Sequence, residues 1–196
     1  MILTEGNLSF HFENDCEAIK YDETDYYQNY FKRMDSGKGI DFIVKSFDQI
    51  LLVEVKDCFG HEKENLWRTK SGFSKENNAD CFDSEVSKKV AMTMAALMGA
   101  HTKPNSCDAA TKLIPFFSDL SSKKISQGKK QIRVIFLLEG EFKSDSRSEK
   151  MIKQRIRDSI EKQLKWMECK VYVETAETIN KRYEKILKVK RTGMNG

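Results

Sequence analysis

The strongest constraint on the fold is a pair of apolar segments separated by a very short connection. The first, residues 39–44, reads Gly-Ile-Asp-Phe-Ile-Val, and the second, residues 50–56, reads Ile-Leu-Leu-Val-Glu-Val-Lys. Apolar runs of this length, joined by only a few residues, are typical of a β-hairpin. The sequence therefore predicts two adjacent antiparallel strands.

The register of this hairpin decides which charged side chains meet. With a two-residue loop at 48–49, Asp41 lies opposite Lys56, and Ile43 lies opposite Glu54. Cross-strand partners project from the same face of a sheet, as do residues i and i+2 of one strand. Asp41, Glu54 and Lys56 are therefore predicted to converge. A three-residue loop without a bulge would instead put Asp41 on the opposite face.

Two carboxylates beside an ammonium can hold a divalent cation and stabilise negative charge on a phosphate. A simpler explanation is that strand ends meet water, where an Asp–Lys pair adds little stability. Glu54, however, lies inside an apolar run that is expected to be covered on both faces. An ionised carboxylate in a strand covered on both faces lowers the stability of the fold unless it is paired or bound to a metal.

At these residues the chain resembles the PD-(D/E)XK nuclease superfamily, which includes type II restriction endonucleases and Holliday-junction resolvases. The core of that superfamily is a helix, a strand hairpin that carries Asp and Glu-x-Lys, a second helix and a further strand. The likeness is closer to an uncharacterised bacterial family within it. It is carried by residues 38–42 and 53–61 and, more weakly, by 20–27 and 85–100. The Pro of the superfamily's name has no counterpart, because Ile40 precedes Asp41.

The resemblance implies an α/β fold, in which a restriction-endonuclease-like mixed central sheet is flanked by helices on both faces. It also implies Mg²⁺- or Mn²⁺-dependent hydrolysis of phosphodiester bonds. It does not itself supply a substrate, and we expect DNA. Asp41, Glu54 and the Val55 carbonyl would hold the metal, and Lys56 would act on the attacking water. Members of the superfamily often act as dimers, so a homodimer is a further expectation. The alternative is a non-catalytic module that keeps the fold and binds nucleic acid or protein.

Residues from three further segments are candidates for an auxiliary role. The superfamily often completes its metal site with an acid from the first helix, where Asp22 and Glu23 lie. These acids could equally just stabilise the start of that helix. Lys89 could assist from the second helix, or could simply pair with Glu85 at i,i+4 spacing. His61 follows the second strand and could carry a proton, although a lone loop histidine is more often a surface residue.

The charge distribution favours a nucleic-acid partner. Residues 1–100 carry 12 Lys/Arg and 18 Asp/Glu, whereas residues 101–196 carry 22 and 12. A basic half can neutralise phosphates without reading sequence, although basic helix faces are often just solvated. The candidate phosphate-binding lysines are Lys123, Lys124, Lys129 and Lys130.

Composition predicts one soluble globular domain over residues 1–196, since 39% of residues are apolar and 33% are charged. No apolar run approaches the roughly 18 residues that span a bilayer, and the first residues do not resemble a secretion signal. Five scattered cysteines form no Cys-x-x-Cys pair, which favours the cytoplasm and no membrane association. Residues 60–83 are expected to form an irregular insertion, and the C-terminus is expected to be a basic tail.

Hydrophobic periodicity predicts the remaining elements. Strands are expected at 8–12, with 18–21 as a partner, at 131–138 and at 171–173. Helices are expected from 23, capped by Asp22; from 83 or 84 to Gly99; over 108–120, interrupted by Pro115; after a capping box at Ser146 and Glu149; and over 176–187.

Overall fold

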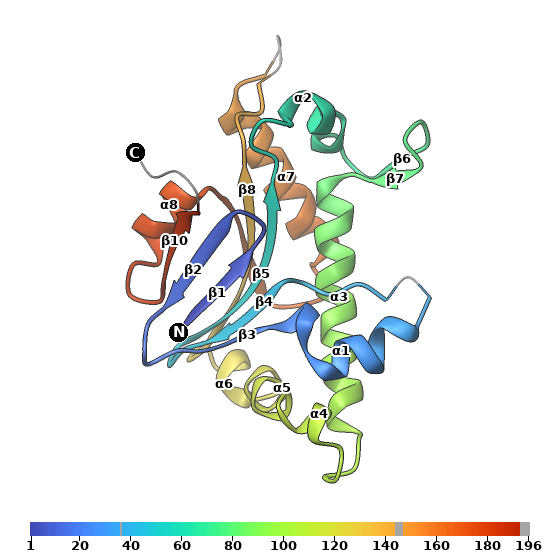
Figure 1. The fold of residues 1–196 in the computed structure, drawn as a ribbon, viewed down its shortest axis with the longest axis vertical. Coiled ribbons are helices and arrows are strands. Elements are labelled where there is room, and N and C mark those ends of the chain that lie inside the picture. Colours follow the sequence, from blue (N-terminus) through green and yellow to red (C-terminus); the bar gives the residue numbers. More distant parts are fainter. Residues whose placement is uncertain (36, 144–146, 193–196) are drawn as a thin grey trace.

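The computed structural model describes residues 1–35, 37–143 and 147–192, and its centre is a five-stranded mixed sheet (Figure 1). The strand order is β3 (Glu17–Lys20), β4 (Phe42–Lys45), β5 (Gln49–Asp57), β8 (Gln131–Glu139) and β9 (Cys169–Glu174). The pairs β3–β4 and β4–β5 are antiparallel, whereas β5, β8 and β9 run parallel. The predicted hairpin is therefore the middle of the sheet.

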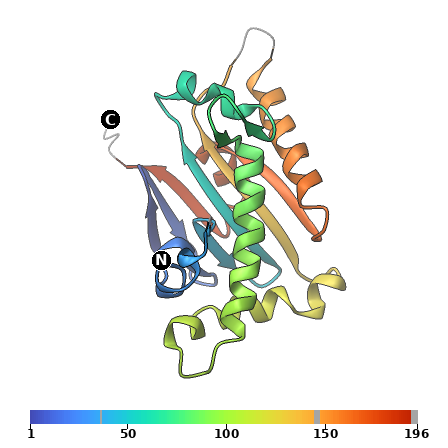
Figure 2. The same cartoon turned by 90° about the vertical axis from the view of Figure 1, so that its right-hand side faces the viewer.

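Two helices cover one face of this sheet, α3 (Phe82–His101) and α7 (Glu149–Gln163) (Figure 2). Their apolar stripes pack against every second residue of the central strands, such as Ile50 and Leu52 of β5. The intervening residues Leu51, Val53 and Val55 belong to a second buried cluster on the opposite face. The apolar run of β5 is thus covered on both sides, as its composition predicts.

The second face differs from the expectation of helices on both sides. It is covered mainly by a small antiparallel sheet in the order β1 (Ile2–Glu5), β2 (Leu8–Phe12) and β10 (Leu187–Arg191), with α8 (Ala176–Arg182) beside it. The C-terminal residues alternate: Leu187 and Val189 are buried, whereas Lys188 and Lys190 are exposed. This period of two makes a strand of the segment that we expected to be a basic tail.

Other short elements connect these layers. They are η1 (Tyr21–Glu23), α1 (Asp25–Asn29), η2 (Phe31–Arg33), α2 (Glu62–Asn65), η3 (Leu66–Thr69), β6 (Phe73–Ser74), β7 (Ala79–Asp80), α4 (Asp108–Thr111), α5 (Ile114–Leu120) and α6 (Lys123–Ser126). The segment at 60–83 is therefore structured rather than irregular. Buried Asp83 anchors it, because its carboxylate accepts hydrogen bonds from the Gly72 N–H and from the Ser159 hydroxyl.

Several predicted pairings and boundaries were wrong. Residues 17–20 pair with β4, and β2 pairs with β1 and β10 instead. Thr24, not Asp22, caps α1, because its hydroxyl accepts a hydrogen bond from the Tyr27 N–H. The helix α3 continues through Gly99 to His101. Ser148 caps α7, while Ser146 lies outside the described residues.

Among the described residues, no helix combines the length and the apolar character that crossing a membrane would require.

Candidate functional site

The β4–β5 hairpin brings Asp41 and Glu54 together, although its register differs from the predicted one. Phe42 pairs with Val53, and the Asp41 N–H donates to the same Val53 carbonyl, so Asp41 lies at the end of the regular pairing. The Ser46 N–H donates to the Gln49 carbonyl, which makes residues 47–48 the two-residue loop. The register is therefore shifted by two residues, an even number, so the paired residues keep their predicted faces. Asp41 lies just outside this pairing, but Lys89 Nζ contacts both Asp41 and Glu54, so the two carboxylates do converge.

Asp41 is held from several sides just before β4 begins. Its Oδ2 accepts a hydrogen bond of 2.6 Å from the Val55 N–H, and its carbonyl accepts one from the Tyr21 N–H. The preceding Ile40 N–H donates to the Thr93 hydroxyl of α3. A Cβ at Gly39 would lie 2.5 Å from the Tyr21 ring, so only glycine allows this close approach. Asp41 is 5% exposed and has little freedom to move.

Glu54 has no exposed surface, and two lysines face one of its oxygens. Its Oε1 lies 2.7 Å from Lys89 Nζ and 3.2 Å from Lys56 Nζ. Its Oε2 is buried without a hydrogen-bond partner among the described residues. Burial, and then the nearby Asp41 carboxylate, raise the pKa of Glu54 to about 8, against the opposing effect of the lysines.

Lys56 forms ion pairs with two glutamates, Glu54 and Glu85. Its Nζ lies 3.0 Å from Glu85 Oε1 on α3, in addition to the contact with Glu54. Glu85 is also paired with Arg68 of η3. Burial alone would lower the pKa of Lys56, but Glu54 and Glu85 outweigh it and the pKa is raised. Burial would raise the pKa of Glu85, and Lys56 and Arg68 reverse this effect. Lys56 is therefore a fixed positive charge.

Lys89 does not form the i,i+4 pair with Glu85 that the helix spacing allows. Its Nζ instead reaches the sheet, 2.7 Å from Glu54 Oε1 and 3.8 Å from Asp41 Oδ1. Glu85 likewise pairs with a residue of the sheet, Lys56, rather than with Lys89. The helix thus supplies one cation and one anion to the candidate site.

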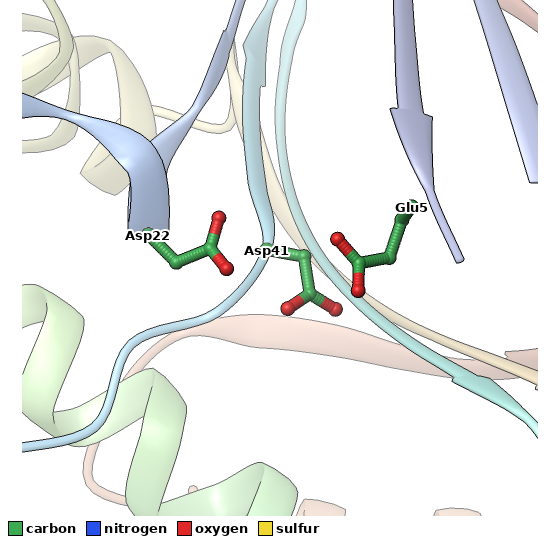
Figure 3. A group of neighbouring side chains, drawn as sticks. All are labelled: Glu5, Asp22 and Asp41. Atoms are coloured by element: carbon green, nitrogen blue, oxygen red, sulfur yellow. The ribbon is translucent and has the colours of Figure 1, made fainter.

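A second group of carboxylates meets at Asp41. Oxygen atoms of Glu5, Asp22 and Asp41 lie within 4.8 Å of one another, and Figure 3 shows the three carboxylates facing a common region. Burial, followed by the charges of Asp41 and Glu5, raises the pKa of Asp22 to about 6. Burial also raises the pKa of Asp41, although Lys89 opposes it. Asp22 Oδ1 is buried without a partner among the described residues.

Other predicted residues lie elsewhere. The exposed His61 ring lies 3.2 Å from Glu64, and Glu23 is exposed and pairs with Lys20. Lys130 is 4% exposed and pairs with Asp119 at 2.7 Å, so it cannot serve as a surface phosphate contact. Three of the predicted lysines, Lys123, Lys124 and Lys129, are exposed, but they precede β8 at the hairpin-turn end of the sheet (Figure 1). They do not surround Glu54 and Lys56.

Sequence reasoning missed three members of the charged cluster. The sequence indicated Glu85 only as the i,i+4 partner of Lys89 on a helix. Arg68 lies in the segment at 60–83 that is predicted to be irregular. Glu5 joins through the packing of β1 and has no local signal in the sequence. The final cluster combines three carboxylates around Asp41 with a second carboxylate–lysine group around Glu54.

These groups provide oxygen ligands of the kind that Mg²⁺ and Mn²⁺ prefer, beside two ammonium groups that can neutralise a phosphate. Comparison with curated proteins and with solved structures finds no match. The model of one family does match, over residues 24–189, and is described as a family of unknown function (DUF6661). Because the matched region covers most of the chain, including the hairpin and α3, the protein belongs to this family.

Proposed function

We propose that the protein is a Mg²⁺- or Mn²⁺-dependent nuclease of the PD-(D/E)XK type, which hydrolyses phosphodiester bonds in DNA. The observation that carries the proposal is the placement of Glu54. This carboxylate is fully buried beside Asp41, and one of its oxygens has no partner among the described residues. A buried oxygen without a partner lowers stability, and a bound ligand would supply that partner.

The order of elements supports the proposal. A short helix α1 precedes the β4–β5 hairpin, which is followed by α3 and by β8, parallel to β5. This is the order helix, hairpin, helix, strand that the superfamily resemblance implies. The covering of the second face by a three-stranded sheet is a difference outside that core.

The residues present fit a divalent cation. Asp41 and Glu54 would supply carboxylate oxygens, and Asp22 and Glu5 lie close enough to Asp41 to add others. The Val55 N–H points toward Asp41, and the carbonyl of the same residue points to the same side of the strand, beyond the end of β4. That carbonyl is a candidate ligand. A bound Mg²⁺ would polarise the phosphate and lower the pKa of a water ligand.

The protein's own cations have distinct roles in this proposal. Lys56 would orient the attacking water and neutralise charge that develops on the phosphate. Glu85 keeps this ammonium in place, and Arg68 in turn holds Glu85. Lys89 bridges Glu54 and Asp41 and limits the repulsion between them. The excess of basic residues in the second half of the chain favours a polyanionic substrate.

The test is cleavage of plasmid, linear and branched DNA by the purified protein in Mn²⁺. We expect Lys56→Met to reduce the rate by roughly 100-fold or more, since it removes a charge aimed at the reacting group. Lys88→Met is the matched control, because Lys88 lies on α3 but is exposed and pairs with Asp80. Metal-dependent cleavage that survives both Lys56→Met and Asp41→Asn would refute the site.

One observation favours the alternative of a non-catalytic binding module. Lys56 and Lys89 together already place two positive charges beside Glu54, so the charge of this carboxylate is compensated without an added ion. Titration calorimetry distinguishes the two functions. A module would bind DNA or protein and show no heat of Mg²⁺ or Mn²⁺ binding at millimolar concentration, whereas a nuclease would bind the metal.

A further inference from the structure

The strand β9 ends the central sheet, and one of its edges has no strand partner among the described residues. All six of its residues belong to a strand that pairs only with β8, so part of its backbone N–H and C=O groups point away from the sheet. In the part of the chain that the structure describes, no side chain or loop forms a hydrogen bond with these groups. An open edge of this kind can pair with another chain.

The edge of β10 is closed in a way that the edge of β9 is not. The Asn180 side chain of α8 donates to the Val189 carbonyl at 2.8 Å, and its Oδ1 accepts from the Val189 N–H at 2.6 Å. One amide group thus satisfies both outward backbone groups of a strand residue, as a further strand would. The described residues provide no such cap for β9.

Open space follows the free edge of β9 along its length. A cavity of about 540 Å³ is lined by Tyr172, Val173 and Glu174, together with residues of α7 and α8. A second cavity, of about 550 Å³, is lined by Cys169 and Lys170 and by the start of β8. Because α7 and α8 pack on opposite faces of the sheet, a cavity that both helices line lies at its edge. A further strand therefore has room beside β9.

The first end of β9 has an excess of negative charge. Burial, followed by the charges of Glu161 and Glu168, raises the pKa of the Cys169 thiol to about 11, so both acids lie near this end. Lys170 is the exposed cation there. Lys130 also lines this cavity, but it is buried and already paired with an aspartate. Two acids and one free lysine leave this end with one net negative charge.

The second end of β9 has the opposite charge. Four cations and two carboxylates line the cavity there: Lys150, Lys153, Arg157, Arg182, Glu149 and Glu174. Asp158, which pairs with Arg157, reduces the excess to one positive charge. A strand with opposite charges at its two ends is complementary to a copy of itself that runs in the opposite direction.

The side chains of β9 also favour one register for such a pair. Lys170, Tyr172 and Glu174 project from the same face. Lys170 forms no ion pair among the described residues. Glu174 binds Arg182 through Oε1 at 2.6 Å, and its Oε2 has no hydrogen-bond partner but is not fully buried. With Tyr172 opposite its own copy, each Lys170 lies opposite a Glu174. A parallel pairing in register would place like charges together.

We propose that β9 pairs antiparallel with β9 of a second copy, so that the two central sheets become one continuous sheet in a homodimer. The two-fold axis passes beside Tyr172, and two symmetric pairs of Lys170 with Glu174 fix the direction. An acidic peptide would match only the second end of β9, so it fits this edge less well than a second copy does. Dimerisation uses no residue of the proposed nuclease site.

The test is sedimentation equilibrium of the full chain in EDTA, where we expect a dimer at micromolar concentration. Lys170→Glu would place two pairs of like charges across the interface and is expected to weaken the dimer at least roughly tenfold. Lys188→Glu is the matched control, because Lys188 is an exposed lysine on the edge strand β10 and undergoes the same change of charge. Both lysines are exposed, so neither variant should fail to fold.

A cysteine substitution tests the register. Oxidation of Tyr172→Cys is expected to give an intermolecular disulfide, because opposed residues of paired strands have Cβ atoms about 4.5–5.5 Å apart. The wild type is the control, since Cys169 and its copy would be six residues out of register, roughly 20 Å. Three outcomes overturn the proposal: a monomer at all concentrations, including one that binds an acidic peptide at this edge; a dimer that Lys170→Glu leaves intact; or folded Tyr172→Cys that forms no disulfide.

Discussion

At the scale of single residues, Glu54 links the stability of the protein to its chemistry. Folding transfers this carboxyl from water to a site without solvent access, and burial raises its pKa from 4.5 to about 8. The folded chain therefore holds a proton more tightly than the unfolded chain does. The contribution of Glu54 to stability is complete below about pH 4.5 and is lost as the pH rises toward 8.

Replacement of Glu54 with Gln tests this linkage. We expect the free energy of unfolding of the wild type to fall more steeply than that of Glu54→Gln between about pH 5 and pH 8. The difference between the two curves should change by roughly 3–4 kcal/mol across this range. Urea denaturation at several pH values in EDTA provides the measurement. Glu64→Gln, at a carboxyl with 75% exposure, should follow the wild type; a Glu54→Gln curve parallel to it would disprove the linkage.

Residue patterns could predict part of this site and not the rest. The burial of Glu54 follows from its place in an apolar run, and its meeting with Asp41 follows from the short connection between two such runs. Lys89 and Glu85 share a helix face at i,i+4 spacing, so sequence alone could not show that each reaches the sheet instead. Contacts between elements, rather than propensity, decide such choices.

At the scale of elements, the sequence could predict which face of the β4–β5 hairpin each side chain occupies, but it could not predict which residues pair across the hairpin. The apolar Phe47 suggested a strand residue, yet it lies in the turn and is 96% exposed. The shift of two residues preserved the faces and changed the partners: Phe42 pairs with Val53, where the predicted register gives Val55. In β10, Lys188 and Lys190 alternate with Leu187 and Val189, and this edge strand was not predicted because a segment rich in lysine also resembles a solvated tail.

The packing of α1 against α3 gives a second test. Gly99 lies inside α3, and a Cβ there would lie 2.9 Å from the Tyr26 hydroxyl. Alanine normally stabilises a helix by about 1 kcal/mol relative to glycine. We expect Gly99→Ala to lower the melting temperature in the wild type, because the hydroxyl must move, and to raise it in a Tyr26→Phe background.

Thermal unfolding of the four variants in this cycle measures the coupling between the two positions. The expected interaction energy is about 1–2 kcal/mol. If Gly99→Ala has the same effect in both backgrounds, the Tyr26 hydroxyl does not restrict this position, and the glycine is explained by other contacts.

At the scale of the whole molecule, the acids around Asp41 come from distant parts of the fold. Glu5 ends β1 of the three-stranded sheet, Asp22 lies in η1, and Asp41 precedes β4 of the central sheet. No local pattern joins residues 5, 22 and 41, because their meeting depends on how the two sheets pack. A cation bound here would connect both layers, and its effect should therefore appear in the stability of the whole chain.

The final prediction concerns Mn²⁺ and pH together. A metal binds the ionised carboxyls, and the raised pKa values of Asp22, about 6, and Glu54, about 8, mean that protons compete with it at low pH. We expect about 1 mM Mn²⁺ to raise the melting temperature by roughly 2–4 °C near pH 8.5 and by much less near pH 6. Scanning calorimetry with and without EDTA provides the measurement.

Asp41→Asn should abolish the shift, and Glu5→Gln should reduce it if the three carboxylates act together. Without metal the same carboxyls make the protein less stable as the pH rises, so the two effects have opposite signs. An equal shift at both pH values, or one that Asp41→Asn retains, would place the cation elsewhere.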